Sequence, residues 1–418
     1  VFAPLSLSLA ADTADTGDSG LSATRSDLNT ANRTVNVSGL AQGDAWQYTT
    51  DGGTTWVNGT GSSFELGDTS AKPVWSLYQD GADLKVRSYI NGTAQFDLRI
   101  GSAGALSDII DLSNNNVRLV SDHVVQGSNT IKTDRVLQWT LWDHALKNTS
   151  YSGSEKRFNV TQAGDGVGDY NPTVRVDLSR DGIIDVWSTP DKQFQTTGFT
   201  QDMAALTRYE FLADGVVKVR HLVQVGDVTL NGAPGQLTQA YFENWLPFLS
   251  NAQVGFTGMA LSLDANGQVL SQYSTQDAYF PAYKSKSFST TNGYAVVYNE
   301  NKPGDMPAIG VVFGTGVSPD GNAALNTMRW NTGLGVLPSL QASQTLQVGA
   351  VIDQSYYLIM RPGLSSELKS QLDHYVPQAT APVIWQPSET PDSSTSALIS
   401  ELTSLRTGTP TATATDTL

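Results

Sequence analysis

The alternation of apolar and polar residues indicates a chain built almost entirely of β-strands. Short alternating runs are separated by Gly, Asn and Asp along most of the sequence, and this period of two residues is typical of strands that bury one face. The clearest case is residues 208–225, where two such runs meet at Asp214-Gly215. An Asp-Gly pair at that place predicts a β-hairpin with a two-residue turn.

A two-residue turn would fix which residues of the hairpin lie opposite each other. One face would then carry Arg208, Glu210 and His221 among apolar residues, and the other would carry Tyr209 and Arg220. Either face could hold a polar, anionic ligand. The predicted cross-strand pairs are Arg208 with His221, Glu210 with Val219, Leu212 with Val217, Tyr209 with Arg220 and Phe211 with Lys218.

The distribution of strand runs divides the chain into three segments. Residues 1–101 contain several short runs and predict a β-sandwich of immunoglobulin size. Residues 102–385 continue with strand runs and predict one large antiparallel β-sandwich with a concave face. Residues 386–418 are a polar linker with a short helix at 396–406. The predicted fold class is therefore all-β.

The first segment carries a family resemblance. The start Asp15-Thr16-Gly17-Asp18-Ser19, the pair Ser26-Asp27, the strand TVNVSGL and the segment WQYTTDGGTTW together resemble the Ig-like repeat module of giant bacterial adhesins exported by type I secretion. In that family such modules are spacers in long arrays with Ca²⁺ at their junctions. The resemblance therefore implies Asp15, Asp18 and Asp27 as Ca²⁺ ligands, with a solvated acidic linker as the alternative. The pattern ends near Val74, so we expect the last strands of this segment to dock on the next domain.

A second resemblance lies near the end of the large segment. The strand LQVGAVIDQSYYLIM (346–360), followed by Arg361-Pro362, is similar to the closing segment of galactose-mutarotase-like supersandwich domains. That family consists mainly of sugar epimerases, polysaccharide lyases and some glycosidases. The resemblance implies a carbohydrate-related domain and transfers no catalytic residue.

Composition narrows the classes of partner. The net charge of −15 argues against a nucleic acid or an anionic membrane surface as partner, and no apolar run is long enough to insert in a membrane. Cysteine is absent, which excludes disulfides and Cys-ligated zinc. An acidic, cysteine-free β-chain is typical of exported bacterial surface proteins, so we expect an extracellular or cell-surface location. The start VFAPLSLSLA lacks a basic region and is not a signal peptide, so we expect a piece of a longer chain with neighbouring modules.

One loop predicts a Ca²⁺ site. Oxygen-bearing side chains at its first, third and fifth positions, a glycine at the sixth and an aspartate at the ninth are the pattern of a Ca²⁺-binding loop. The twelfth position is Ser188 rather than Glu, so the loop is not a complete EF-hand. A plain Asp-Gly hairpin is the alternative. The candidate ligands are Asp177, Ser179, Asp181, Ile183 and Asp185.

Other residues offer catalysis or sugar binding. His221 next to Arg208 would stay neutral and could accept a proton, although a lone histidine in a valine-rich strand can also be a satisfied core residue. Glu210 and Glu243 could form a pair of catalytic acids if their strands are neighbours. Sugar-binding candidates with an aromatic ring or a carboxylate on one strand face or loop are Tyr241, Glu243, Trp245, Tyr279 and Tyr283.

These observations support two main hypotheses and a weaker third. The first is a bacterial surface-adhesion protein whose large β-sandwich, stabilised by Ca²⁺, binds polysaccharide and is presented by an Ig-like spacer. The second is a secreted polysaccharide lyase or other carbohydrate-active enzyme, in which His221, Tyr241 and Arg208 would supply the bases and the cation. The third is a structural subunit of a surface layer or fibre.

Overall fold

The structure is a computed structural model of the whole chain, and only part of it is described here. The described residues are 6–9, 34–38, 40, 46–48, 57–59, 61–65, 74–80, 83–101, 104–119, 138–143, 157–159, 173–180, 182–189, 193–194, 199–230, 233–235, 240–249, 256–274, 284–288, 292–313, 321–330, 333–342 and 345–408. In several of these strands only the backbone is described.

The described elements are mostly antiparallel β-strands, which confirms the all-β fold class. The strands of residues 1–65 form a three-stranded sheet in the order β1-β2-β5 and a separate pair, β3-β4. The resemblance of this segment to an adhesin module stays a prediction. The bounds are β1 (Ser6–Leu9), β2 (Thr34–Ser38), β3 (Gln47–Tyr48), β4 (Val57–Asn58) and β5 (Ser63–Glu65).

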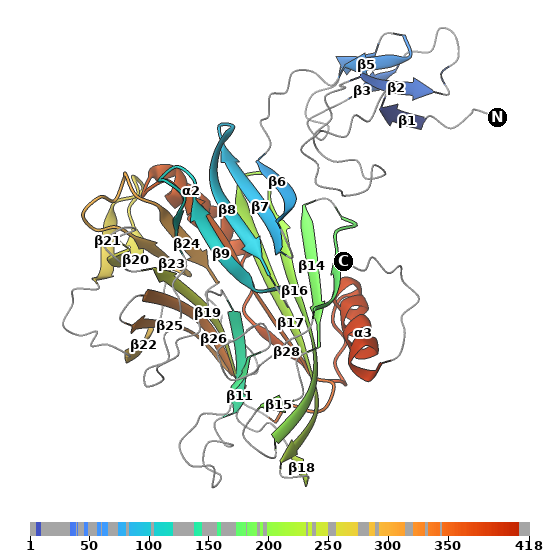
Figure 1. The fold of residues 1–418 in the computed structure, drawn as a ribbon, viewed down its shortest axis with the longest axis vertical. Helices are drawn as coiled ribbons and strands as arrows, with labels where there is room; N and C mark the ends of the chain where they lie inside the picture. The colour runs from blue at the N-terminus through green and yellow to red at the C-terminus, as the bar shows by residue number, and fades with distance from the viewer. Residues whose placement is uncertain are drawn as a thin grey trace.

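Two sheets of intermediate size follow (Figure 1). The five-stranded sheet has the order β10-β9-β8-β7-β6 and consists of β6 (Trp75–Asp80), β7 (Asp83–Ile90), β8 (Thr93–Ile100), β9 (Leu106–Asp111) and β10 (Val117–Arg118). The six-stranded sheet has the order β12-β11-β19-β26-β25-β22 and consists of β11 (Gln138–Asp143), β12 (Arg157–Asn159), β19 (Ala240–Leu249), β22 (Lys284–Phe288), β25 (Gly321–Trp330) and β26 (Gly333–Ala342).

The large sheet has twelve strands and organises the rest of the molecule. Its main path is β13-β14-β16-β17-β27-β24-β23-β20-β21, and three short strands pair beside that path. The bounds are β13 (Thr173–Asp177), β14 (Ile183–Ser188), β15 (Gln193–Phe194), β16 (Phe199–Phe211), β17 (Val216–Leu230), β18 (Ala233–Gly235), β20 (Gly258–Leu263), β21 (Val269–Ser274), β23 (Tyr294–Tyr298), β24 (Ala308–Val312), β27 (Val351–Arg361) and β28 (Val383–Trp385).

One face of the large sheet, here called the inner face, is covered by the five-stranded sheet. Apolar side chains of both sheets form one continuous core, which includes Leu98 and Ile109 from the smaller sheet and Val217, Val219 and Leu358 from the larger. Trp75 of β6 adds to this contact, because its indole donates a hydrogen bond to the carbonyl oxygen of Leu212 at 2.7 Å. The boundary predicted at residue 101 falls between β8 and β9, which are hydrogen-bonded neighbours in one sheet.

The opposite, outer face of the large sheet carries two helices. Helix α2 (Ser366–Tyr375) begins at the N-cap Ser365, continues into the short 3₁₀-helix η2 (Val376–Gln378), and buries Leu368 and Leu372 on the sheet. Helix α3 (Ser393–Thr407) confirms the helix predicted at 396–406, and its Leu402 is buried against Trp187. Helix α2 was not predicted. Among the described residues, neither helix is long and apolar enough to cross a membrane.

The hairpin of β16 and β17 is present, but its predicted register is wrong by one residue. Leu212 donates its amide hydrogen to the carbonyl of Val216 at 2.9 Å, so the turn has three residues, Ala213 to Gly215. Gly215 has φ +80°, whereas Asp214 has no left-handed φ, and a two-residue Asp-Gly turn would need both. The Asn91-Gly92 turn meets this requirement with φ of 50° and 70°, and it joins β7 and β8 with two residues.

The observed register sorts the side chains better than the predicted one. Tyr209 lies opposite Val219 and Phe211 opposite Val217, so apolar residues share the inner face. Arg208 lies opposite Arg220 and Glu210 opposite Lys218, so ionic residues share the outer face. A slip of one residue would have mixed the two sets, and burial of the apolar set therefore selects the longer turn.

Gly215 provides a test of this turn. Replacement of Gly215 with Ala should lower the free energy of unfolding by roughly 1 kcal/mol, because a side chain disfavours left-handed backbone. Space is not the obstacle, since the nearest heavy atom to an added Cβ would be Arg361 Nη1 at 3.5 Å. Gly304→Ala is the matched control, because Gly304 has no left-handed φ and no atom within 4 Å of an added Cβ. Equal urea midpoints for the two variants would contradict this account of the turn.

Candidate functional site

Ionic side chains cross the outer face of the large sheet in two neighbouring rows, and Asp353 adds a carboxylate from the adjoining row, opposite Leu222. We call this set the ionic strip, and it consists of Asp185 on β14, Arg208 and Glu210 on β16, Lys218 and Arg220 on β17, and Asp353 on β27. The strip lies between two apolar clusters. Leu206 and Leu222 on one side pack against α3, and Val216 on the other side packs in the cluster that contains α2.

The two arginines of the strip are held by carboxylates on opposite sides. Arg208 donates from Nε and Nη2 to the two oxygens of Asp185 at 2.7 and 2.9 Å, and Arg180 also bonds Asp185. Arg220 donates from the same atoms to Asp353 at 2.9 and 2.7 Å. Such two-bond pairs fix the plane of a guanidinium group. The arginines are therefore oriented in advance of any ligand.

The solvent exposure of the side chains varies along the strip. The side chain of Arg208 is only 9% exposed, whereas those of Glu210 and Lys218 are 25% and 29% exposed. Lys218 Nζ and Glu210 Oε2 are 3.8 Å apart, which is a weak contact. The more exposed part of the strip thus offers an ammonium group and a carboxylate that interact only weakly with each other.

Aromatic and hydroxyl groups border the same surface. Trp385 Nε1 donates to Asp353 at 3.3 Å, and Thr395 at the start of α3 accepts a hydrogen bond from Arg220 at 2.9 Å. Tyr357 is the cross-strand partner of Lys218, and its hydroxyl lies 3.5 Å from the carbonyl of Gln378. Donors, acceptors and rings occur together here, which is the combination that sugar hydroxyls require.

The cluster of Arg208, Glu210 and His221 expected on one face is not formed. The register shift leaves Arg208 and Glu210 on the outer face and places His221 on the inner face, opposite Thr207. The predicted pairing of Tyr209 with Arg220 is wrong for the same reason. Tyr209 is buried on the inner face, where its hydroxyl donates to the carbonyl of Gly104 at 2.6 Å.

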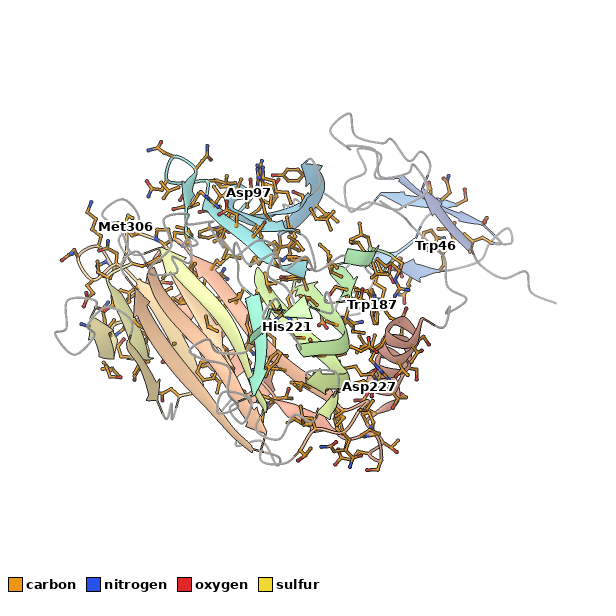
Figure 2. All side chains as sticks on the ribbon, turned by 60° about the horizontal axis from the view of Figure 1, so that its bottom comes forward. Trp46, Asp97, Trp187, His221, Asp227 and Met306 are labelled. Carbon is orange, nitrogen blue, oxygen red and sulfur yellow. The ribbon has the colours of Figure 1, made fainter. Side chains whose placement is uncertain are left out.

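His221 is buried on the inner face of the large sheet. The residue is 2% exposed, its Nδ1 is 3.3 Å from the Thr207 hydroxyl, and its ring centre is 5.9 Å from that of Tyr356. Figure 2 shows His221 beside the strands of the large sheet. The ring of Phe242, on β19 of the six-stranded sheet, is 6.5 Å away. The alternative of a core histidine, rather than an exposed base, therefore describes this residue.

Burial lowers the pKa of His221 to about 3. The imidazole is accordingly neutral at ordinary pH, and it binds protons too weakly to serve as a base near neutrality. Burial likewise raises the pKa of the Tyr209 phenol well above its usual value, so it stays protonated. These two groups fit a core better than an active site.

Strand β19 does not bring Glu243 beside Glu210. β19 pairs with β11 and β26 in the six-stranded sheet, whereas β16 pairs with β14, β15 and β17, so the two acids are not on neighbouring strands. Only the backbone is described for Tyr241, Glu243 and Trp245. The loop residues Tyr279 and Tyr283 lie outside the described residues.

The predicted Ca²⁺ loop joins β13 and β14 as a hairpin with Asp177 opposite Asp185. Asp177 accepts a hydrogen bond from the Ser179 amide at 2.8 Å. Burial favours a higher pKa for Asp177, but bonds from Ser179 and the charges of Arg175 and Arg180 hold its pKa below the ordinary value. Ile183 begins β14.

Asp185 is the ligand that fits Ca²⁺ least well. Both of its oxygens already bond guanidinium groups, so a Ca²⁺ ion would have to compete with Arg208 and Arg180 for them. Within the described part of the chain no group of three acidic or histidine side chains could hold a metal. Asp181, Asp15, Asp18 and Asp27 lie outside that part.

The sequence did not single out Lys218, Asp353 or Trp385 as members of this surface. Asp353 lies 133 residues from its partner Arg220, so only the pairing of β17 with β27 joins them. The signal in the sequence is the polar run Asp353-Gln354-Ser355 inside an otherwise apolar strand, but nothing local indicates which strand lies beside it.

His221 provides a second test. A His221→Gln difference NMR spectrum should identify an imidazole signal that does not shift between about pH 5 and pH 8, because its folded-state pKa lies far below that window. The unfolded chain binds a proton near pH 6.5 and the folded chain does not, so this residue should lower stability as pH falls below about 6.5. A midpoint near 6.5 would show an exposed histidine instead.

Comparisons with known proteins add a likeness to several solved structures. No family model matches the sequence, and the search of curated proteins finds no match either. An aldose epimerase homologue from C. elegans has a TM-score of 0.40 at 11% identity, and the match covers 69% of this chain and 98% of that one.

Two further structures come from bacteria. A putative mutarotase from Salmonella typhimurium has a TM-score of 0.38 at 9% identity, covering 69% of this chain and 94% of that one. A heparan sulfate lyase from Pedobacter heparinus has 0.34 at 8%, and the match covers 70% of this chain but only 37% of the lyase. Two of these three proteins are described as a mutarotase or an aldose epimerase homologue, and residues 346–362 resemble the closing segment of mutarotase-like domains. All three TM-scores lie below 0.5, so the function is argued from the residues of this chain.

Proposed function

We propose that this protein binds a polysaccharide at the bacterial cell surface, and that the ionic strip is its contact surface. The observation that carries the proposal is the strip itself: charged side chains, of which Lys218 is the most exposed at 29%, lie between the apolar clusters under α2 and α3. Half-buried ionic pairs contribute little net stability compared with apolar packing of the same volume. Their presence at this place is therefore better accounted for by a ligand than by stability.

The chemistry of the strip suits a sugar chain. Lys218 and Arg220 supply donors, Glu210 and Asp353 supply acceptors, and Trp385 supplies an aromatic ring at the edge. Sugar hydroxyl groups both donate and accept hydrogen bonds, and the bidentate pairs keep the arginine planes fixed before binding. Preformed geometry lowers the entropy that a flexible ligand surface would lose.

An enzyme is supported less well. A lyase needs a base and a cation near one carbon atom, and the described geometry separates His221 from Arg208 by the thickness of the sheet. We therefore propose binding rather than cleavage. The exported, surface-bound location rests on the acidic, cysteine-free composition and on the adhesin-like pattern of the first segment.

The contact surface can be tested by binding measurements on the full chain. A panel of soluble polysaccharides is screened by affinity electrophoresis, and the double variant Glu210→Gln/Lys218→Gln is compared with the parent protein. Loss of both hydrogen-bonding charges should weaken binding about tenfold, or about 1.4 kcal/mol. Both members of the pair change together, so no charge is left uncompensated.

Lys369→Gln/Asp373→Asn is the matched control, since it removes a Lys–Asp pair from helix α2. Binding should survive this change. If the parent protein bound none of the polysaccharides, the proposed function would be refuted. If the strip variant bound as tightly as the parent protein, the contact surface would lie elsewhere. Unsaturated sugar ends, detected by ultraviolet absorbance, would establish the lyase instead.

We also propose that Ca²⁺ binds in the loop between β13 and β14, with Asp177, Ser179 and Asp181 as ligands. The support is the spacing of these oxygen-bearing side chains. Chelation by EDTA should lower the melting temperature, because a ligand that binds only the folded state stabilises it. Asp177→Asn should abolish that shift. An EDTA melt identical to the melt in Ca²⁺ would remove calcium from the proposal.

A further inference from the structure

Asp111 is a buried acid at the contact between the five-stranded sheet and the large sheet. It ends β9, lies opposite Phe96 on β8 and Val117 on β10, and is 1% exposed. Phe96 belongs to the core shared by the two sheets, so Asp111 is on the face of the five-stranded sheet that packs against the large sheet. A carboxyl group therefore occupies a position where the neighbouring residues are apolar.

The two oxygens of Asp111 have different surroundings. Oδ1 accepts hydrogen bonds from the Ser113 amide at 3.0 Å and the Ser113 hydroxyl at 2.7 Å. Oδ2 is buried and has no hydrogen-bond partner in the part of the chain that the structure describes. An ionised carboxylate in such a place carries the full cost of lost hydration at that oxygen, whereas a neutral carboxylic acid loses much less.

The other buried acids of this sheet have cations beside them. Asp97 bonds Arg87 at 2.7 and 2.9 Å, and Asp108 bonds Arg118 at 2.7 Å. Both pairs are on the outer face of the five-stranded sheet, because their positions alternate with those of Phe96 and Asp111. Figure 2 labels Asp97 on this sheet. Among the described residues, Asp111 has no such cation on its own face.

The element packed across from this corner is the turn between β23 and β24. Asn114 Nδ2 lies 4.0 Å from the Met306 sulfur, which joins the turn after β9 to that turn of the large sheet. The opposing turn contains Lys302 and Asp305, which are exposed, and Glu300, which is partly buried, negatively charged and bonded by Gln272. The neighbouring strands present Asp97 and Arg118 to the outer face. No charge from the described elements therefore offsets an ionised Asp111.

We infer that the protonation of Asp111 controls how firmly the five-stranded sheet packs on the large sheet. The protonated acid keeps this corner closed, and the ionised acid loosens it; we call this role the latch. The proton needed comes from solvent, and no other group changes its bonding. This role is independent of the ionic strip, which lies on the opposite face of the large sheet. It would make the docking of β8, β9 and β10 respond to the acidity of the surroundings.

The direction of the pH dependence follows from the surroundings. Burial raises the pKa of Asp111, bonds from Ser113 and Asn114 lower it in part, and the net pKa is above the ordinary 3.8. The folded chain therefore holds this proton at a pH where the unfolded chain has lost it. The stabilisation is fully present below about pH 3.8 and is lost as pH rises through the folded-state pKa.

Hydrogen exchange on the full chain tests the latch. Peptides covering residues 106–119 report the amides that close this corner, including Leu112 bonded to Gln95 and Leu119 bonded to Ile109. Other groups, including His221, also change stability with pH, so the readout is the ratio of protection in the parent protein to protection in Asp111→Asn, which is neutral at every pH. After correction for intrinsic exchange, this ratio should be at least threefold larger at about pH 4 than at about pH 8.

Asp108→Asn is the matched control. It removes an acid from the same strand, but one that bonds Arg118, so it should lower protection at both pH values and keep the pH trend of the parent. The same ratio at both pH values would overturn the inference. In a His221→Gln background, which lacks the opposing titration, constant protection at residues 106–119 would overturn it even if the Asp111 variant failed to fold. An unchanged pH trend in a folded Asp111→Asn variant would overturn it as well.

Discussion

The register of β16 against β17 is the constraint on which the rest of the structure depends. The turn that sets it is itself held from outside. Arg361 Nη2 donates to the carbonyl of Asp214 at 3.0 Å, and the Tyr375 hydroxyl donates to the Asp214 carboxylate at 2.9 Å. Helix α2 and the end of β27 thus fasten the turn. Because the side chains of a strand alternate, this single register decides which residues enter the inner core and which form the ionic strip.

The two faces of the large sheet are stabilised by different interactions. The inner face is apolar and close-packed, so its contribution comes from surface removed from water. The outer face combines two apolar clusters under helices with ionic pairs between them. Paired charges at this depth lose hydration, and their attraction offsets that loss without much surplus. The outer face therefore gains little net stability from its ionic pairs.

Buried ionisable groups behave according to their partners rather than their type. Asp97, Asp108, Asp185 and Asp353 each bond a cation, so their negative charge is compensated. Asp111 has none, and burial raises its pKa. His221 is the basic counterpart, because burial alone lowers its pKa. The interior thus contains an acid and a base that both favour their neutral forms, and their effects on stability have opposite directions with pH.

The sequence by itself determined the all-β class, the hairpin at Asp214-Gly215 and the terminal helix, because these depend on residues close together in the chain. Alternation, turn residues and capping residues are local signals. The hairpin of β13 and β14 depends on local signals in the same way, and the sequence offered it as the alternative to a Ca²⁺ loop. The charged residues on β16 and β17 were also named from the sequence, although their predicted cross-strand partners were wrong by one residue.

Only the tertiary structure decided the turn length, the faces and the site. The choice between a two-residue and a three-residue turn rests on burial against a second sheet, which the local sequence does not encode. Asp353 meets Arg220, and Trp385 meets Asp353, through strands that are far apart in sequence. His221 was placed in the core by β19 of another sheet. A pattern with period two states that a strand has two faces, but packing alone decides which of them meets water.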